Sequence, residues 1–192
     1  MAGAPRGFPV DWLADPAAPA SDVELALLLV NSHDLLEEQP DRLGDLTWLT
    51  SAFTSVGHAD LAADLSETDL PRLRALREAL RRVFVSDDVT EVAAALNPLL
   101  EQARTLLVVD PETGPALRVG VGLRGLAALE ARLPAALAAY VAEPGLDRLG
   151  VCGSDPCRCV FVDRTRAGTR KYCCTYCNDR HAARAYRRRK RS

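Results

Sequence analysis

The chain has 192 residues, of which 48% are apolar, which is enough for one ordinary folded domain and a small second one. This composition excludes a chain that is disordered throughout. The net charge of −2 hides an asymmetry, because residues 151–192 carry +9 and residues 1–150 carry −11. An acidic body joined to a basic tail predicts different partners for the two parts.

The N-terminal residues 1–20 lack a basic segment followed by a continuous apolar run. We therefore expect a flexible leader here and no signal peptide. The longest apolar stretch, residues 123–141, is interrupted by charged side chains and by Pro134. This interruption argues against a membrane span.

Apolar residues at helical spacing indicate an α-rich body over most of the first 145 residues. Alternation between apolar and polar residues, with a turn at residues 110–114, predicts one β-hairpin within it. Pro134 is expected to bend the last helix of the body. The expected helices are residues 24–31, 41–53, 70–84, 88–101 and 122–142, and the expected strands are residues 105–109 and 116–121.

The expected fold class is therefore α+β, mostly α, with two folded parts. An α-rich domain with one hairpin is expected over residues 21–145, and a small zinc finger over residues 146–192. The sequence Glu-Pro-Gly at 143–145 marks the expected joint. Because all expected metal ligands follow the joint, we expect the finger to fold separately, so that a chelator would leave the body's thermal transition nearly unmoved.

All six cysteines lie between Cys152 and Cys177, within the last quarter of the chain. A secreted scaffold spreads its cysteines through the fold that the disulfides hold together, whereas this clustering indicates a metal site in a reducing compartment. We therefore expect a cytoplasmic protein.

Two cysteine pairs have the spacing of a tetrahedral Zn²⁺ site. Cys152 and Cys157 form the first pair, and Cys173 and Cys177 form the second pair about 15 residues later. The sequence therefore predicts one structural Zn²⁺ on these four thiolates. The register has alternatives, since Cys174 has ligand spacing to Cys177 and Cys159 could replace Cys157. We prefer Cys173 because Tyr172 leads directly into it from an expected strand.

The segment between the pairs predicts the architecture of the finger. Residues 159–163 and 169–172 resemble two strands, with a turn at residues 167–168, and residues 175–190 are expected to form a helix. A cysteine knuckle, a hairpin and two ligands at a helix N-terminus make a treble-clef-like finger. The helix N-terminus also favours thiolates through its partial positive charge.

The C-terminal helix is strongly basic. Arg180, Arg184, Arg187 and Arg191 share one face, and Arg188 widens the stripe. Like charges this close repel each other, so we expect an anionic partner, and arginine suits phosphates and guanine edges. These five arginines are the predicted contacts to duplex DNA, with Arg180 expected to reach a base edge.

The cysteine-rich tail resembles the CGNR-type zinc finger. The resemblance lies in Cys152-x4-Cys157, Phe161-x-Asp163, Arg170-x-Tyr172-Cys173 and Cys177-x-x-Arg180 before an arginine-rich helix. In that family an ABATE domain precedes the finger. The body agrees, because Leu-Val-Asn-Ser at 29–32 is similar to the ABATE signature Leu-Val-Asn-Thr.

The resemblance covers residues from about 22 to the C-terminus and implies a bacterial transcription regulator. The family is named for the motif Cys-Gly-Asn-Arg. This sequence departs from that motif, because residues 177–180 are Cys-Asn-Asp-Arg. Asp179 would repel phosphate unless it pairs with a neighbouring arginine.

Asn31, Ser32 and His33 end a buried-looking helix and are a candidate pocket for a small-molecule effector. An asparagine there is also a common helix cap. Three histidines and no nucleophile–base constellation give no visible catalytic machinery, so we expect no enzyme. The favoured hypothesis is a DNA-binding regulator whose body senses a ligand or forms a homodimer. The alternative is a zinc-dependent module that docks an acidic protein or RNA.

Overall fold

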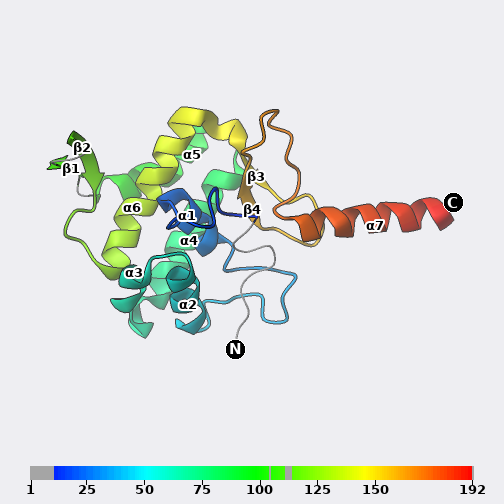
Figure 1. The fold of residues 1–192 in the computed structure, drawn as a ribbon, viewed down its shortest axis with the longest axis horizontal. Helices are drawn as coiled ribbons and strands as arrows, with labels where there is room; N and C mark the ends of the chain where they lie inside the picture. The colour runs from blue at the N-terminus through cyan, green and yellow to red at the C-terminus, as the bar shows by residue number, and fades with distance from the viewer. Residues whose placement is uncertain (1–10, 104, 111–113, 192) are drawn as a thin grey trace.

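The computed structural model describes residues 11–103, 105–110 and 114–191. It is mostly helical and has two small antiparallel sheets of two strands each (Figure 1). The helices are α1 (Asp22–Val30), α2 (Thr47–Ser55), α3 (Ala59–Ala63), α4 (Leu70–Val85), α5 (Val89–Leu100), α6 (Gly125–Tyr140) and α7 (Thr175–Arg191). The strands are β1 (Thr105–Asp110), β2 (Gly114–Val119), β3 (Leu149–Val151) and β4 (Val160–Val162), and short helical turns lie at Glu67–Asp69, Val141–Gly145 and Leu146–Arg148.

Helix α1 is the centre of the body. Its side chains from Glu24 to Val30 are all buried, as expected for a helix that is apolar on every side. Ser21 and Glu24 form a capping box that fixes the first turn. Helices α4 and α6 both pack against α1, and together they make the main core.

Helices α4 and α6 follow the predicted periodicity. Leu73, Leu80 and Val83 on α4 are fully buried, as are Leu129 and Leu133 on α6. The helical stretch Gly125–Arg148 meets the length and composition of a membrane span among the described residues. A core helix passes the same test, and α6 contacts α1, α3, α4 and α5 along its length.

The predicted hairpin in the body is confirmed. Strand β1 pairs antiparallel with β2, with Thr105 opposite Val119. The hairpin lies at the end of the molecule opposite to α7 (Figure 1). Residues 111–113 of the predicted turn lie outside the described part of the chain.

The helix predicted over residues 41–53 begins later, at Thr47. Two aspartates hold the preceding residues in turns. The Asp41 carboxylate accepts a hydrogen bond from the Leu43 N–H at 3.0 Å, and Asp45 accepts one from the Thr47 N–H at 2.7 Å. Such local bonds compete with helix formation.

The strand predicted over residues 169–172 is wrong. Strand β4 pairs instead with β3, which precedes the first ligand pair, with Val151 opposite Val160. The segment after β4 is held as a loop by Asp163, whose carboxylate accepts from the N–H and hydroxyl of Thr165 and from the Arg170 N–H at 2.6–2.8 Å. These bonds turn the chain away before a second strand can pair.

Within residues 11–20 of the predicted leader, the two ends pack against the rest of the chain, whereas residues 14–19 are exposed. Trp12 and Leu13 are buried. The Arg164 guanidinium donates to the Trp12 carbonyl at 2.9 Å and to Glu24 at 2.9 Å. Residues 1–10 lie outside the described residues.

The body and the finger share one core. Val160 and Val162 of β4 are fully buried in the same cluster as α1, α4 and α6. The Asn31 side chain, itself fully buried, donates to the Val160 carbonyl at 3.0 Å and accepts from the Val160 N–H at 2.7 Å. The finger therefore packs against the core of the body, and its separate folding stays a prediction that chelation tests.

Replacement of Asn31 by alanine should lower the free energy of unfolding by roughly 2–4 kcal/mol, because it leaves two buried backbone groups of Val160 without partners. Urea denaturation of the zinc-loaded protein measures this change. Asn97→Ala, at an exposed position on α5, is the matched control and should change stability by less than about 1 kcal/mol. Equal losses in the two variants would contradict the structural role of Asn31.

Candidate metal centre and basic helix

The first ligand pair lies on a tight knuckle that follows β3. The Cys152 N–H donates to the Cys159 carbonyl at 2.9 Å, and the Cys157 N–H donates to the Ser154 carbonyl at 2.9 Å. These bonds turn the chain back on itself, so that Cys152 and Cys157 face the same point. Both side chains are buried.

The second pair lies where α7 begins. Cys173 precedes the helix and Cys177 is in its first turn, and their sulfurs are 3.7 Å apart. The Cys157 and Cys173 sulfurs are 3.8 Å apart, and all four sulfurs lie within 4.8 Å of one another. A tetrahedron with Zn–S bonds of about 2.3 Å has edges of about 3.8 Å. The four cysteines therefore fit one structural zinc.

The two remaining cysteines lie beside this set. The Cys174 sulfur is 3.7 Å from that of Cys173, but it is not within 4.8 Å of all the others. Cys159 belongs to a different group with Cys157 and Asp34. The geometry thus favours Cys173 over Cys174 and Cys157 over Cys159, as predicted.

Hydrogen bonds between the sulfurs shift their pKa values in opposite directions. Hydrogen bonds from Cys152 and the other neighbouring sulfurs lower the pKa of Cys157. The hydrogen bond between Cys159 and Cys157, together with burial, raises the pKa of Cys159. Hydrogen bonds with the neighbouring sulfurs also raise the pKa of Cys173, and a bound zinc would ionise this thiol.

Two residues that sequence reasoning left out of the site support the second pair. The Arg170 guanidinium donates to the Tyr172 carbonyl at 2.9 Å and also to the Cys173 carbonyl, and it lies 5.3 Å from the Phe161 ring. Burial alone would raise the pKa of Asp163, but hydrogen bonds from Thr165 and the Arg170 N–H lower it. The motifs that carry the family resemblance contain both residues.

Arg180 and Arg184 bind the knuckle. Arg180 donates to the Asp155 carbonyl at 2.7 Å and to the Ser154 carbonyl at 3.3 Å, and Arg184 also donates to the Asp155 carbonyl. These bonds fix α7 relative to the zinc ligands. The prediction that Arg180 reads a base edge finds no support in this arrangement.

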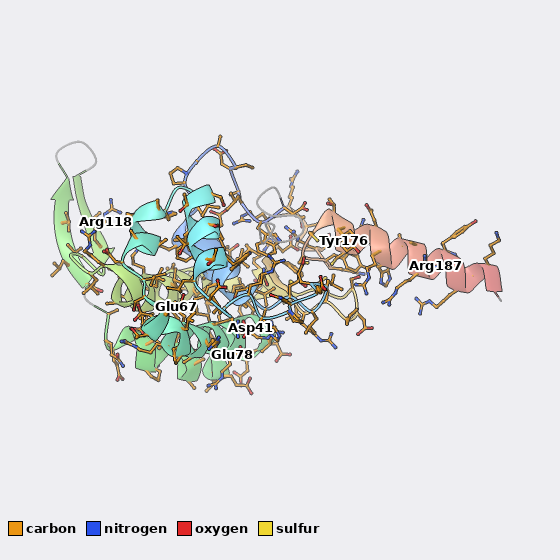
Figure 2. The ribbon with its side chains drawn as sticks, turned by 90° about the horizontal axis from the view of Figure 1, so that it is seen from below. Asp41, Glu67, Glu78, Arg118, Tyr176 and Arg187 are labelled. Atoms are coloured by element: carbon orange, nitrogen blue, oxygen red, sulfur yellow. The ribbon has the colours of Figure 1, made fainter. Side chains whose placement is uncertain are left out.

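The C-terminal part of α7 extends away from the rest of the molecule (Figure 1). The helix carries seven arginines and lysines and one aspartate. Arg187, Arg188, Arg189 and Lys190 are exposed, and Figure 2 shows Arg187 near the free end. The backbone of Arg191 continues the helix, while its side chain lies outside the described part. A cavity of about 520 Å³ between the knuckle and α7 is lined by Ser154, His181, Arg184, Arg187 and Arg188, among others.

The predicted effector pocket finds no support at Asn31 and Ser32. Asn31 is the C-cap of α1 and uses its amide on Val160. The buried Ser32 hydroxyl donates to the Leu29 carbonyl at 2.7 Å and accepts from Arg77 at 3.2 Å. His33 is exposed. The first two side chains therefore hold the fold together.

Two family models match the chain. Residues 23–149 match ABATE, described as a "Putative stress-induced transcription regulator", and residues 148–190 match the CGNR zinc finger. Their order agrees with the resemblance noted above. No curated protein matches the chain.

Replacing Cys173 by serine should remove the zinc, whereas replacing Cys174 by serine should leave one zinc per chain. Only Cys173 belongs to the four sulfurs that fit a tetrahedral site. Metal analysis of the purified variants after desalting measures the difference. The reverse pattern would show that the ligand register is wrong.

Proposed function

Since the chain belongs to the ABATE family and ends in a CGNR zinc finger, we propose that it is a transcription regulator that binds duplex DNA through α7. The observation that carries this proposal is the position of the exposed cations. Arg187, Arg188, Arg189 and Lys190 lie on a helix that leaves the body, and a zinc site anchors its first turn.

The fixed start of α7 supports this function. Zinc ligation through Cys177 and the bonds from Arg180 and Arg184 to the knuckle carbonyls hold the helix in one direction. A rigid helix loses less conformational freedom when it binds. Of the predicted treble-clef elements, the knuckle and the ligand pair at the helix N-terminus account for this rigid attachment.

The charge of the helix favours phosphate as its ligand. Four neighbouring cations repel one another in the free protein, and DNA phosphates relieve that repulsion while releasing counterions. The −11 charge of residues 1–150 opposes DNA approach unless the body lies away from it. The separation of α7 from the body meets that condition (Figure 1).

The proposal also covers the role of the body, the cellular location and the absence of catalysis. The protein acts in the cytoplasm, has no catalytic activity, and uses its α-rich body to sense an effector or to form a homodimer. If α7 does not retain DNA, the alternative is a zinc-dependent module that docks an acidic protein or RNA. Exposed arginines and lysines suit either polyanion.

Binding to duplex DNA should weaken with salt, and log K should fall against log salt with a slope of roughly −4 if about four cations neutralise phosphates. Replacing Arg187 and Arg189 together by alanine should flatten the slope by about two on every sequence. Fluorescence anisotropy over a salt series measures both values.

The matched control is Arg118→Ala, an exposed arginine of β2 at the opposite end of the molecule from Arg187 (Figure 2). Its slope should equal that of the unchanged protein. If the unchanged protein retains no duplex DNA at about 50 mM salt but does retain RNA or an acidic protein, the DNA proposal fails and the alternative replaces it.

A further inference from the structure

A second group of metal-ligating side chains lies next to the zinc site. One carboxylate oxygen of Asp34 and the sulfurs of Cys157 and Cys159 lie within 4.8 Å of one another, and all three residues are buried. Asp34 comes from the loop after α1 in the body, whereas Cys157 and Cys159 belong to the finger. The group therefore joins the two parts that the family models divide.

We propose that Asp34, Cys157 and Cys159 form a second binding site for a thiophilic divalent cation such as Zn²⁺, Co²⁺ or Cd²⁺. Cys157 bridges the two metals, and Asp34 and Cys159 bind the second metal alone. Three protein ligands leave one coordination position open for water or an exchangeable group. The second cation is therefore held less tightly than the structural zinc.

The geometry requires only a small closure. Ligand atoms around a tetrahedral zinc are separated by about 3.4–3.8 Å, so each distance between two of these three atoms must shorten by at most about 1.4 Å. Asp34 is already oriented, because its Oδ1 accepts a hydrogen bond from the Leu36 N–H at 2.9 Å. Ligating carboxylates in metal sites are commonly held by such a bond.

The charges also favour a second cation. Four thiolates on one Zn²⁺ carry −2, and the Asp34 carboxylate adds to that negative charge in a buried place. With an ionised Asp34 the net charge is −3, and a divalent ion that displaces the proton of Cys159 changes it to −2, since a metal ionises the thiol that it binds.

A second metal at this place would fasten the body to the finger. The loop that carries Asp34 follows Asn31, and the strand that begins after Cys159 contains Val160, the partner of Asn31. A metal bound at the second site adds coordinate bonds between the body and the finger beside those hydrogen bonds. The metal would therefore stabilise the position of the finger relative to the body.

Cobalt tests this site in the full chain. Protein that carries one zinc per chain is titrated with Co²⁺, while thiolate-to-cobalt absorption is recorded and both metals are counted after desalting. The unchanged protein should retain its zinc and bind one Co²⁺ with a thiolate band. Asp34→Asn should weaken cobalt binding at least about tenfold, the loss that even outer-shell changes produce. Cys159→Ser should weaken the thiolate-to-cobalt absorption band, because it removes the Cys159 thiolate from the site.

Cys174→Ser is the matched control, because Cys174 is a buried cysteine next to a zinc ligand but lies outside this group. It should bind cobalt as the unchanged protein does. Circular dichroism and a zinc content of one establish that each variant is folded. The proposal is overturned if the unchanged protein binds no thiolate-ligated cobalt beside its zinc. It is also overturned if the Asp34→Asn, Cys159→Ser double variant shows the same band, or if Cys174→Ser alone abolishes it.

Discussion

The pairing of the Asn31 side chain with Val160 is the interaction on which the arrangement of the molecule depends. Strand β4 has one edge on β3, and the N–H and C=O of Val160 point from its other edge into the core. A buried strand edge without partners would be costly, and Asn31 supplies both a donor and an acceptor. One side chain at the end of α1 thus makes the hydrogen bonds that a neighbouring strand would make, and it fixes the position of the finger on the body.

The position of α7 depends on the Asn31–Val160 pairing through a short series of contacts. Strand β4 lies between the two ligand pairs, and zinc ties both pairs together. Arg180 and Arg184 then fix the start of the helix to the knuckle. The cations that follow them are exposed on the part of α7 that extends from the molecule. The basic helix is therefore directed by the core of the body as well as by the zinc.

The sequence predicts those features that depend on local spacing. The periodicity of α4 gave its bounds closely, and the intervals between Cys152, Cys157, Cys173 and Cys177 gave the ligand set. It could not predict the partner of Asn31, which is 129 residues away. Nor could it separate Arg180 from Arg187, because both fall on one helical face and only the folded knuckle provides carbonyls for the former. Strand β3 was missed because three residues are too few for an alternating pattern.

If body and finger form one cooperative unit, removal of zinc must affect both parts. Hydrogen exchange of backbone amides in α1, α4 and β4 would be compared before and after chelation, together with the thermal transition of the whole chain. Loss of zinc should lower the main transition temperature and reduce protection at the end of α1 and along α4 as well as in β4. An unchanged main transition, with protection lost from the finger alone, would show that the two parts fold independently.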